Sequence, residues 1–197
     1  MIYKFKLDDV IFSKLKHWIK DKSETYNEKL AGNIRDEFGL DKYKKEFEPY
    51  IINVVKNIEP LRTYFLELDV LWPNDQPLVL KSLWVNFQKK YEFNPIHKHG
   101  GLFSFIIFIQ IPYTSEEQSA AAPGNKSNDD VAGKLSFVYP DGNNKGGIST
   151  QVVDADKSWE GTGLIFKAHL RHCVYPFYTE GERITISGNL YFGNEKT

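Results

Sequence analysis

Three short segments that lie far apart in the sequence carry the residues with the clearest chemical potential. The first holds His97 and His99, the second holds His169 and His172, and the third begins at Arg183. Imidazole nitrogens suit Fe, Zn, Cu or Ni, and a guanidinium binds a carboxylate through a planar fork of N–H donors. Together these residue types predict a metal site that also holds an anionic molecule.

The spacing of the histidines decides which of them can meet. Residues two apart on a regular strand face the same side, so His97 and His99 can share one ion. His169 and His172 would face opposite sides of an extended strand, so only one of them can reach the site directly. Other roles remain open at this point: a solvated pair beside a turn, a hydrogen-bonded His172 near a sheet edge, and a structural salt bridge for Arg183.

The segment from Arg183 to Phe192 alternates polar and apolar residues, as expected for a strand with two different faces. The polar face carries Arg183, Thr185, Ser187, Asn189 and Tyr191, and the apolar face carries Ile184, Ile186, Leu190 and Phe192. We expect the apolar face to pack against N-terminal helices and the polar face to line a hydrated cavity. An arginine there is costly unless an anion meets it.

The first sixty residues are predicted to be helical. The three expected helices are one capped by Asp8 or Asp9, a weaker one from Tyr26 to Phe38 that stops at Gly39, and one from near Asp41 to before Pro60. Pro49 lies inside the third pattern and predicts a kink or a break.

Beyond Pro60 the pattern changes to strands. We expect strands at Tyr64 to Val70, Val79 to Lys90, Phe103 to Ile111, Lys134 to Tyr139, Ile148 to Val153, Gly163 to Phe166 and Arg183 to Phe192. Turn residues separate them without helical patterns, which argues for a sandwich or barrel. The segment from Thr114 to Gly133 lacks periodicity and is predicted to be a long mobile loop, either a lid or a disordered insertion. The sequence predicts one domain over residues 1–197, with a helical part at 1–60 and a β core at 61–197.

Composition excludes several classes of protein. The formal net charge is −1 over 197 residues, which is unlike the basic footprint of a nucleic-acid binder. Cys173 is the one cysteine, so no intrachain disulfide can form, in agreement with a reducing compartment. No apolar run approaches the ~20 residues of a membrane span. We therefore expect a cytoplasmic protein with no membrane partner and no nucleic-acid partner.

The run from Trp84 to Phe192 resembles the Fe(II)/2-oxoglutarate-dependent oxygenases, in particular the small oxygenases of bacterial and marine phage sequences. Three stretches carry the resemblance: Trp84 to Gln88 leading to Asn94–Gly100, Ser104–Ile107 with Ile111-Pro112, and His172–Pro176 with Gly181–Asn189. The resemblance implies an α+β fold with a double-stranded β-helix (jelly-roll) core and N-terminal helices packed on one sheet. It also places the protein in the host cytoplasm if a phage encodes it.

The resemblance implies roles for the histidines. His97 matches the first iron ligand and His172 the distal one, while His99 stands where the broader superfamily has a carboxylate. An acidic residue from a loop is an alternative way to complete the metal shell, and the candidates are Asp154, Asp156 and Glu160.

The resemblance also implies the co-substrate. Arg183 matches the residue that binds the 5-carboxylate of 2-oxoglutarate, Thr185 and Ser187 share its face, and Ser104 is a further candidate for the same pocket. The implied activity is that of a dioxygenase, a hydroxylase that uses Fe(II), O2 and 2-oxoglutarate and releases succinate and CO2. The prime substrate is not readable from the sequence.

Two other functions stay open. One is a cupin-like three-histidine metalloenzyme that does not use 2-oxoglutarate, for which Arg183 would have no co-substrate role. The other is a non-catalytic jelly-roll binding or structural module, which would bind no metal at His97 and His172. The polar face of the last predicted strand argues against the second alternative.

Overall fold

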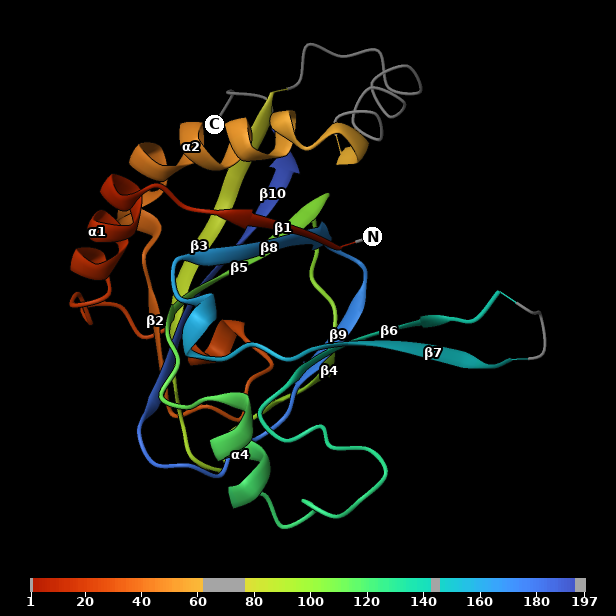
Figure 1. Ribbon diagram of the computed structural model, residues 1–197. Coiled ribbons are helices and arrows are strands. Elements are labelled where there is room, and N and C mark those ends of the chain that lie inside the picture. Colours follow the sequence, from red (N-terminus) through yellow and green to blue (C-terminus); the bar gives the residue numbers. More distant parts are fainter. Residues whose placement is uncertain (1, 62–76, 143–145, 194–197) are drawn as a thin grey trace.

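Two antiparallel β-sheets form the centre of the molecule (Figure 1). The computed structural model describes residues 2–61, 77–142 and 146–193. Its strands are β1 (Ile2–Lys6), β2 (Asp36–Gly39), β3 (Leu78–Lys89), β4 (Asn94–His97), β5 (Phe103–Gln110), β6 (Leu135–Pro140), β7 (Ile148–Val153), β8 (Thr162–Lys167), β9 (Arg171–Val174) and β10 (Glu182–Phe192). The larger sheet has the order β1-β8-β5-β10-β3-β2, and the smaller sheet has the order β4-β9-β6-β7.

From β3 onward the chain passes back and forth between the two sheets. β3, β5, β8 and β10 belong to the larger sheet, whereas β4, β6, β7 and β9 make up the smaller one. β10 is central, because it pairs with β3 on one side and with β5 on the other. Residues from both sheets line one cavity of about 170 Å³. The layered arrangement therefore places this cavity between the two sheets.

The alternation predicted for the last strand is present in β10. Its apolar face joins the main apolar core, through Ile184, Ile186 and Leu190. Its polar face lines the cavity, through Arg183, Thr185 and Ser187. β3 continues this polar surface, because its residues that pair with those three also line the cavity: Gln88, Asn86 and Trp84.

Two helices cover the outer face of the larger sheet (Figure 1). α1 (Asp9–Trp18) is capped by Asp8, whose carboxylate accepts a hydrogen bond from the Ile11 backbone N–H at 2.8 Å. α2 (Lys44–Asn57) packs Phe47 against Phe105 of β5 with a ring separation of 5.9 Å. The expected apolar cover for β10 is thus confirmed.

Of the kink or break predicted at Pro49, the break does not occur, because α2 runs through this residue. Proline removes one backbone hydrogen bond and crowds the carbonyl four residues earlier. Both Pro49 and Lys45 are exposed, so water can hydrate that carbonyl. The buried face of α2, with Ile51 and Val55, holds the helix on the sheet.

The weak helical pattern from Tyr26 to Phe38 is also wrong. Asn27–Lys29 forms one short 3-10 turn, and the end of the segment forms β2, which pairs with β3 at the edge of the larger sheet. β1 is a second edge strand within the predicted helical part, and it pairs with β8. Strands of four and five residues gain their stability from their partners, so their own sequences give little signal.

Six of the predicted strands are confirmed with both ends within one residue, namely β3, β5, β6, β7, β8 and β10. The strand predicted at Tyr64 to Val70 lies outside the described residues. No helix in the described part of the chain has the length and apolar character needed to cross a membrane.

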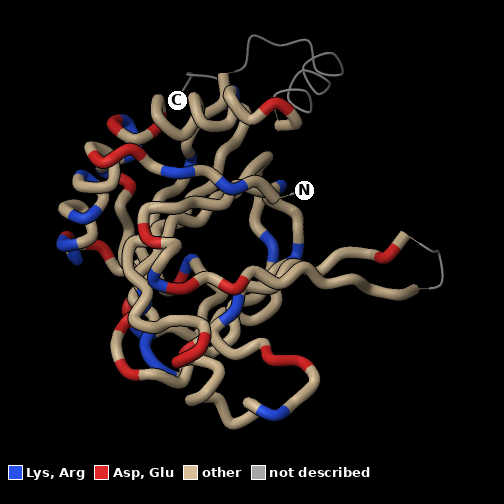
Figure 2. Tube along the Cα trace, in the orientation of Figure 1, with Lys and Arg blue, Asp and Glu red and all other residues tan. Residues whose placement is uncertain are grey.

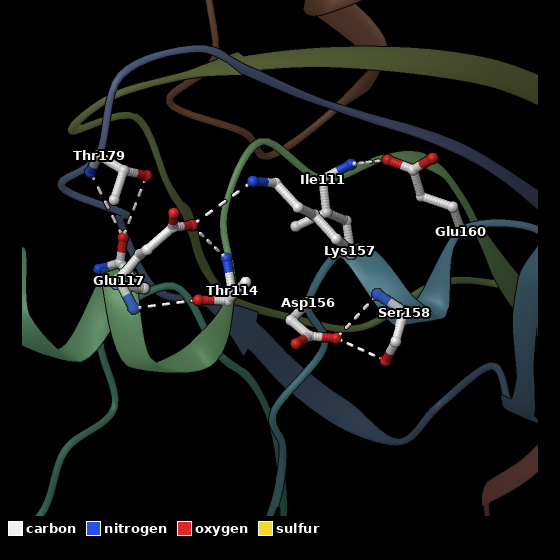
Figure 3. A network of polar contacts seen from close by, with 9 residues as sticks. Ile111, Thr114, Glu117, Asp156, Lys157, Ser158, Glu160 and Thr179 are labelled. Atoms are coloured by element: carbon white, nitrogen blue, oxygen red, sulfur yellow. Dashed lines mark hydrogen bonds and ion pairs between the residues drawn. The ribbon is translucent and has the colours of Figure 1, made fainter.

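The segment between Thr114 and Gly133 is not a loop throughout, because it begins with α4 (Ser115–Ala121). The Thr114 hydroxyl accepts from the Glu117 backbone N–H at 3.2 Å, and the Glu117 carboxylate accepts from the Thr114 backbone N–H at 2.8 Å (Figure 3). This capping box satisfies two donors at the start of the helix. Lys157 lies 3.5 Å from the same carboxylate and links α4 to the turn before β8. The Thr-x-x-Glu pattern that specifies the cap is visible in the sequence.

Charged residues are interspersed along the chain and do not gather on one side (Figure 2). The β6–β7 hairpin extends away from the rest of the molecule and carries few charges (Figures 1 and 2). The described part of this hairpin exposes Tyr139, Ile148 and Val152.

Candidate metal centre

Three histidines meet at the cavity between the sheets. His97 is the last residue of β4, and its Cα partner across the smaller sheet is His172 of β9. The ring centroids of His97 and His172 are 4.3 Å apart, and that of His99 lies 4.9 and 5.0 Å from them. One potential ligand atom from each ring lies within 4.8 Å of the other two. This clustering allows the three imidazoles to share one metal ion.

His99 reaches the cluster by a route that differs from the expected one. β4 ends at His97, so the two residues do not lie on one regular strand. The His99 backbone N–H instead donates to the Ala168 carbonyl at 2.9 Å, which ties the segment after β4 to the turn before β9. His169, the alternative to His172, is exposed and takes no part in the cluster.

Backbone carbonyls orient two of the rings. His97 Nδ1 lies 2.7 Å from the Pro95 carbonyl oxygen, and His172 Nδ1 lies 2.9 Å from that of Leu170. A carbonyl oxygen only accepts, so in each ring Nδ1 carries the proton and donates. Nε2 of each ring is then the unprotonated nitrogen available to a metal.

Apolar surroundings keep the rings neutral. Phe166 and Phe137 lie 5.0 and 5.7 Å from His172 between ring centroids, and Trp84 lies 5.7 Å from His99. Burial, followed by repulsion from neighbouring histidines, lowers the pKa of His99 to about 3 and that of His172 to about 4. Burial also lowers the pKa of His97. Neutral imidazole is the form that binds metals.

The same pKa shifts predict how the stability of the metal-free protein depends on pH. An unfolded histidine has a pKa of about 6.5, so below that pH the unfolded chain binds more protons than the folded one. We expect the free energy of unfolding to fall as pH drops from about 6.5 towards 4, by up to about 1.4 kcal/mol per pH unit for each ring that stays neutral. Urea unfolding at a series of pH values measures this slope.

Carboxylates elsewhere in the protein also titrate between pH 6.5 and 4, so a matched variant is needed to isolate the contribution of the histidine cluster to the pH dependence of stability. His172→Gln removes one titrating ring, so its unfolding free energy should depend less steeply on pH than that of the unmodified protein. Equal slopes between pH 6.5 and 4 would contradict the assignment of this dependence to His172.

Arg183 lies in the same cavity and is held by neutral groups. Its Nε and Nη2 donate to the Gln88 side-chain carbonyl at 3.1 and 2.5 Å. Its Nη1 donates to the Tyr113 hydroxyl at 2.7 Å and to the Gly133 carbonyl at 2.5 Å. The side chain is 4% exposed, and no carboxylate of the described residues lies within ion-pair distance of it. A buried guanidinium without an anion is costly, so this position favours an anionic ligand.

Of the other three residues predicted to contact the co-substrate, two line the cavity and one does not. Thr185 and Ser187 line the cavity beside Arg183. Ser104 is absent from the cavity lining, and its hydroxyl donates to the Asn189 side chain at 2.7 Å. Ser104 therefore fastens β5 to β10, which is a structural role.

The loop carboxylates proposed as further metal ligands are occupied elsewhere. Asp156 accepts from the backbone and hydroxyl of Ser158 at 2.9 and 2.6 Å, and Glu160 accepts from the Ile111 backbone at 3.0 Å (Figure 3). Asp154 accepts from the Ser115 hydroxyl at 3.1 Å. None of these three acids belongs to the histidine cluster.

Sequence reasoning missed several residues of the cavity. Gln88 and Tyr113 position Arg183, and Asn86 and Glu37 complete the wall beside them. Asn86 and Gln88 did leave a signal, because they alternate along a strand that is otherwise mostly apolar. Glu37 carries no such signal, because the pattern of its segment predicts a helix.

Comparisons with known proteins agree with this geometry. Residues 82–189 match the model of the family described as "Putative 2OG-Fe(II) oxygenase". A search of curated proteins finds no match.

Among solved structures, a prolyl-4-hydroxylase from Pseudomonas putida is similar at 10% identity and a TM-score of 0.50, over 98% of this chain and 92% of that one. SnoN, a non-heme alpha-ketoglutarate-dependent epimerase from nogalamycin biosynthesis, is similar at 13% identity and a TM-score of 0.55, over 97% and 78%. The match to a 2OG-Fe(II) oxygenase family oxidoreductase from Burkholderia pseudomallei, at 17% identity and a TM-score of 0.43, covers 74% of this chain but 58% of that one.

At these identities the structural matches bear on the fold alone, whereas the family model covers more than half of the chain. It spans β3 to β10 almost completely, and thus all three histidines and Arg183. The chain therefore belongs to the 2OG-Fe(II) oxygenase family, whose cofactors are Fe(II) and 2-oxoglutarate.

Proposed function

We propose that this protein is an Fe(II)- and 2-oxoglutarate-dependent dioxygenase that hydroxylates its substrate. One observation carries the proposal: a buried arginine with only neutral partners shares a cavity with three clustered, neutral histidines. A metal site and an anion site in one enclosed space suit a co-substrate that binds a metal at one end and presents a carboxylate at the other.

The fold assigned to this function is a double-stranded β-helix. The order β8-β5-β10-β3 in the larger sheet and β4-β9-β6-β7 in the smaller one supports it, since strands after β3 change sheets at nearly every step. Such closed antiparallel architectures present ligand sites between their layers.

The proposed roles follow from where each side chain lies. His97, His99 and His172 bind the metal, with carbonyl-oriented Nε2 atoms in the first and third. Arg183 binds the 5-carboxylate of 2-oxoglutarate, and Thr185 and Ser187 line the same wall. The aromatic rings of Trp84, Phe137 and Phe166 lie beside His99 and His172 and limit the access of water to them. Exclusion of water strengthens charge interactions in the site.

When bound, iron and 2-oxoglutarate supply the oxidising power. One O2 is consumed, 2-oxoglutarate loses CO2 and becomes succinate, and a C–H bond of the substrate becomes C–OH. The chain's own residues position the reactants, neutralise the distal carboxylate and hold the imidazoles unprotonated.

His99 sets this site apart electrostatically. Three neutral imidazoles leave the charge of +2 on the ion, which dianionic 2-oxoglutarate would neutralise. We expect His99→Asp to retain Fe(II) binding but to weaken 2-oxoglutarate binding severalfold, because the added negative charge repels the dianion. His99→Ala should weaken Fe(II) binding at least about 100-fold, because loss of a ligand costs more than the 10–100-fold caused by loss of a residue that only orients a ligand. Anaerobic calorimetry measures both affinities, and unchanged Fe(II) binding by His99→Ala would exclude His99 as a ligand.

Succinate formation tests the proposed activity. The protein supplied with Fe(II), O2 and 2-oxoglutarate labelled at C1 should release labelled CO2 and an equal amount of succinate, and omission of Fe(II) should stop both. A metal-dependent reaction that proceeds without 2-oxoglutarate would instead favour the cupin-like alternative.

A further inference from the structure

Two buried hydrogen-bond acceptors in the cavity wall have no donor. Within the described residues the buried side-chain atoms lacking a partner are Glu37 Oε1, Asn86 Oδ1 and Gln118 Nε2. Glu37 and Asn86 are Cα partners on β2 and β3, and both line the cavity that contains the histidines. A buried acceptor without a donor destabilises the folded protein. Two adjacent ones in a cavity wall indicate a ligand group that brings its own donors.

The neighbouring residues hold the Glu37 side chain in place. Asn27 Nδ2 lies 3.3 Å from the second carboxylate oxygen, Oε2, and 2.8 Å from the Ile34 carbonyl. A methyl group added at Gly32 would lie only 2.7 Å from Glu37 Oε1 and 2.6 Å from Asn94 Oδ1. Gly32 therefore lies close against both side-chain oxygens, and a larger side chain at this position would displace them.

The charge of the cavity wall around Glu37 and Asn86 suits a cation. Glu37 is the one carboxylate among the described residues that line the cavity, and it is 1% exposed. Lys29 and Lys98 also line the cavity, but Lys29 lies 3.1 Å from Glu24 at the surface and Lys98 is exposed to solvent. Burial, followed by repulsion from Glu92, raises the pKa of Glu37 to about 7, and a bound cation would favour its ionised form.

The part of the cavity wall formed by Glu37 and Asn86 is separate from Arg183. Asn86 Nδ2 donates to the Thr185 hydroxyl at 3.4 Å, so the row across β2, β3 and β10 runs Glu37, Asn86, Thr185. Neighbouring strands are about 4.8 Å apart, which places Glu37 two strands, or about 10 Å, from β10. A molecule held at Glu37 can therefore occupy the cavity together with an acid held at Arg183.

We propose that Glu37 and Asn86 form a subsite for a basic group with at least two N–H donors, a guanidinium or a primary ammonium, on the prime substrate. A guanidinium offers two parallel donors to two neighbouring acceptors, so an arginine-like substrate fits best. The identification of this ligand as the substrate rests on the proposed function, whereas the binding of a basic group to Glu37 does not.

Binding of small probes tests the subsite without any turnover. Methylguanidinium and its neutral counterpart N-methylurea are titrated into the metal-free protein and into the anaerobic Fe(II)–2-oxoglutarate form, with NMR chemical shifts as the readout. We expect methylguanidinium to bind at least tenfold more tightly than N-methylurea. Glu37→Gln, which keeps the shape of the side chain, should remove that preference. Glu116→Gln, an equal charge change at an exposed residue outside the cavity lining, should keep it.

A second variant guards against misfolding of the first. Gly32→Ala places a methyl group against Glu37 Oε1. It should displace the carboxylate and so weaken methylguanidinium binding without changing the charge. Equal binding of the two probes, or a preference that survives both Glu37→Gln and Gly32→Ala, would overturn the subsite. Free L-arginine and an arginine-containing peptide then compete with the probe, and the tighter competitor identifies the source of the basic group. If the protein binds the probe but fails to form a complex with Fe(II) and 2-oxoglutarate when both are supplied, the proposed function is contradicted and the subsite stays intact.

Discussion

Arg183→Gln is expected to abolish tight binding of 2-oxoglutarate while leaving the metal site intact. Loss of one partner from a buried, hydrogen-bonded charge pair costs about 2–5 kcal/mol, and 1.4 kcal/mol is tenfold in affinity. The dissociation constant should therefore rise between about 30-fold and 3,000-fold. Anaerobic calorimetry with the Fe(II)-loaded protein measures it. Arg183→Lys keeps the positive charge but lacks the planar fork of donors. Its affinity for 2-oxoglutarate should therefore lie between that of the unmodified protein and that of Arg183→Gln.

A shorter acid provides the control. 2-Oxobutyrate keeps the 2-oxo acid group that binds metal but lacks the distal carboxylate. It should bind the unmodified protein and Arg183→Gln with similar affinity, because it makes no contact with the guanidinium. If Arg183→Gln bound 2-oxoglutarate as tightly as the unmodified protein does, Arg183 would have no co-substrate role.

His172→Ala is expected to remove Fe(II) binding. His172 is the most enclosed of the three rings, at 5% exposure, and pairs directly with His97 across β4 and β9. Loss of outer-shell partners alone costs 10–100-fold in metal affinity, so loss of a ligand should cost at least about 100-fold. Anaerobic Fe(II) titration measures the affinity.

The chain offers a matched control three residues away. His169 is exposed and lies outside the cluster, so His169→Ala should bind Fe(II) like the unmodified protein. Equal losses in the two variants would mean that the assignment of the distal ligand to His172 is wrong.

Features that repeat along one strand were predictable from the sequence. The alternation of β10 separates its core face from its cavity face, and burial enforces that register. Arg183, Thr185 and Ser187 therefore reach the cavity as expected. His172, and not His169, lies in the histidine cluster, although β9 starts only at Arg171.

Features that depend on contacts between distant segments were not predictable. His99 joins the cluster through a hydrogen bond to Ala168, not through strand geometry. Glu37 enters the cavity wall only because β2 pairs with β3, and a short edge strand carries little local signal. Ser104 faces Asn189 instead of the cavity, since a position along the strand does not specify which neighbour a side chain meets.

The most direct test of the account is an anaerobic titration of Fe(II) and 2-oxoglutarate into the protein, monitored by visible absorption. Convergence of the three imidazoles and the guanidinium on one cavity predicts a metal-to-ligand charge-transfer band that appears only when both are present. The band should saturate at one equivalent and be lost in His172→Ala. Folded protein that binds neither component, or binds both without producing the band, would contradict the account.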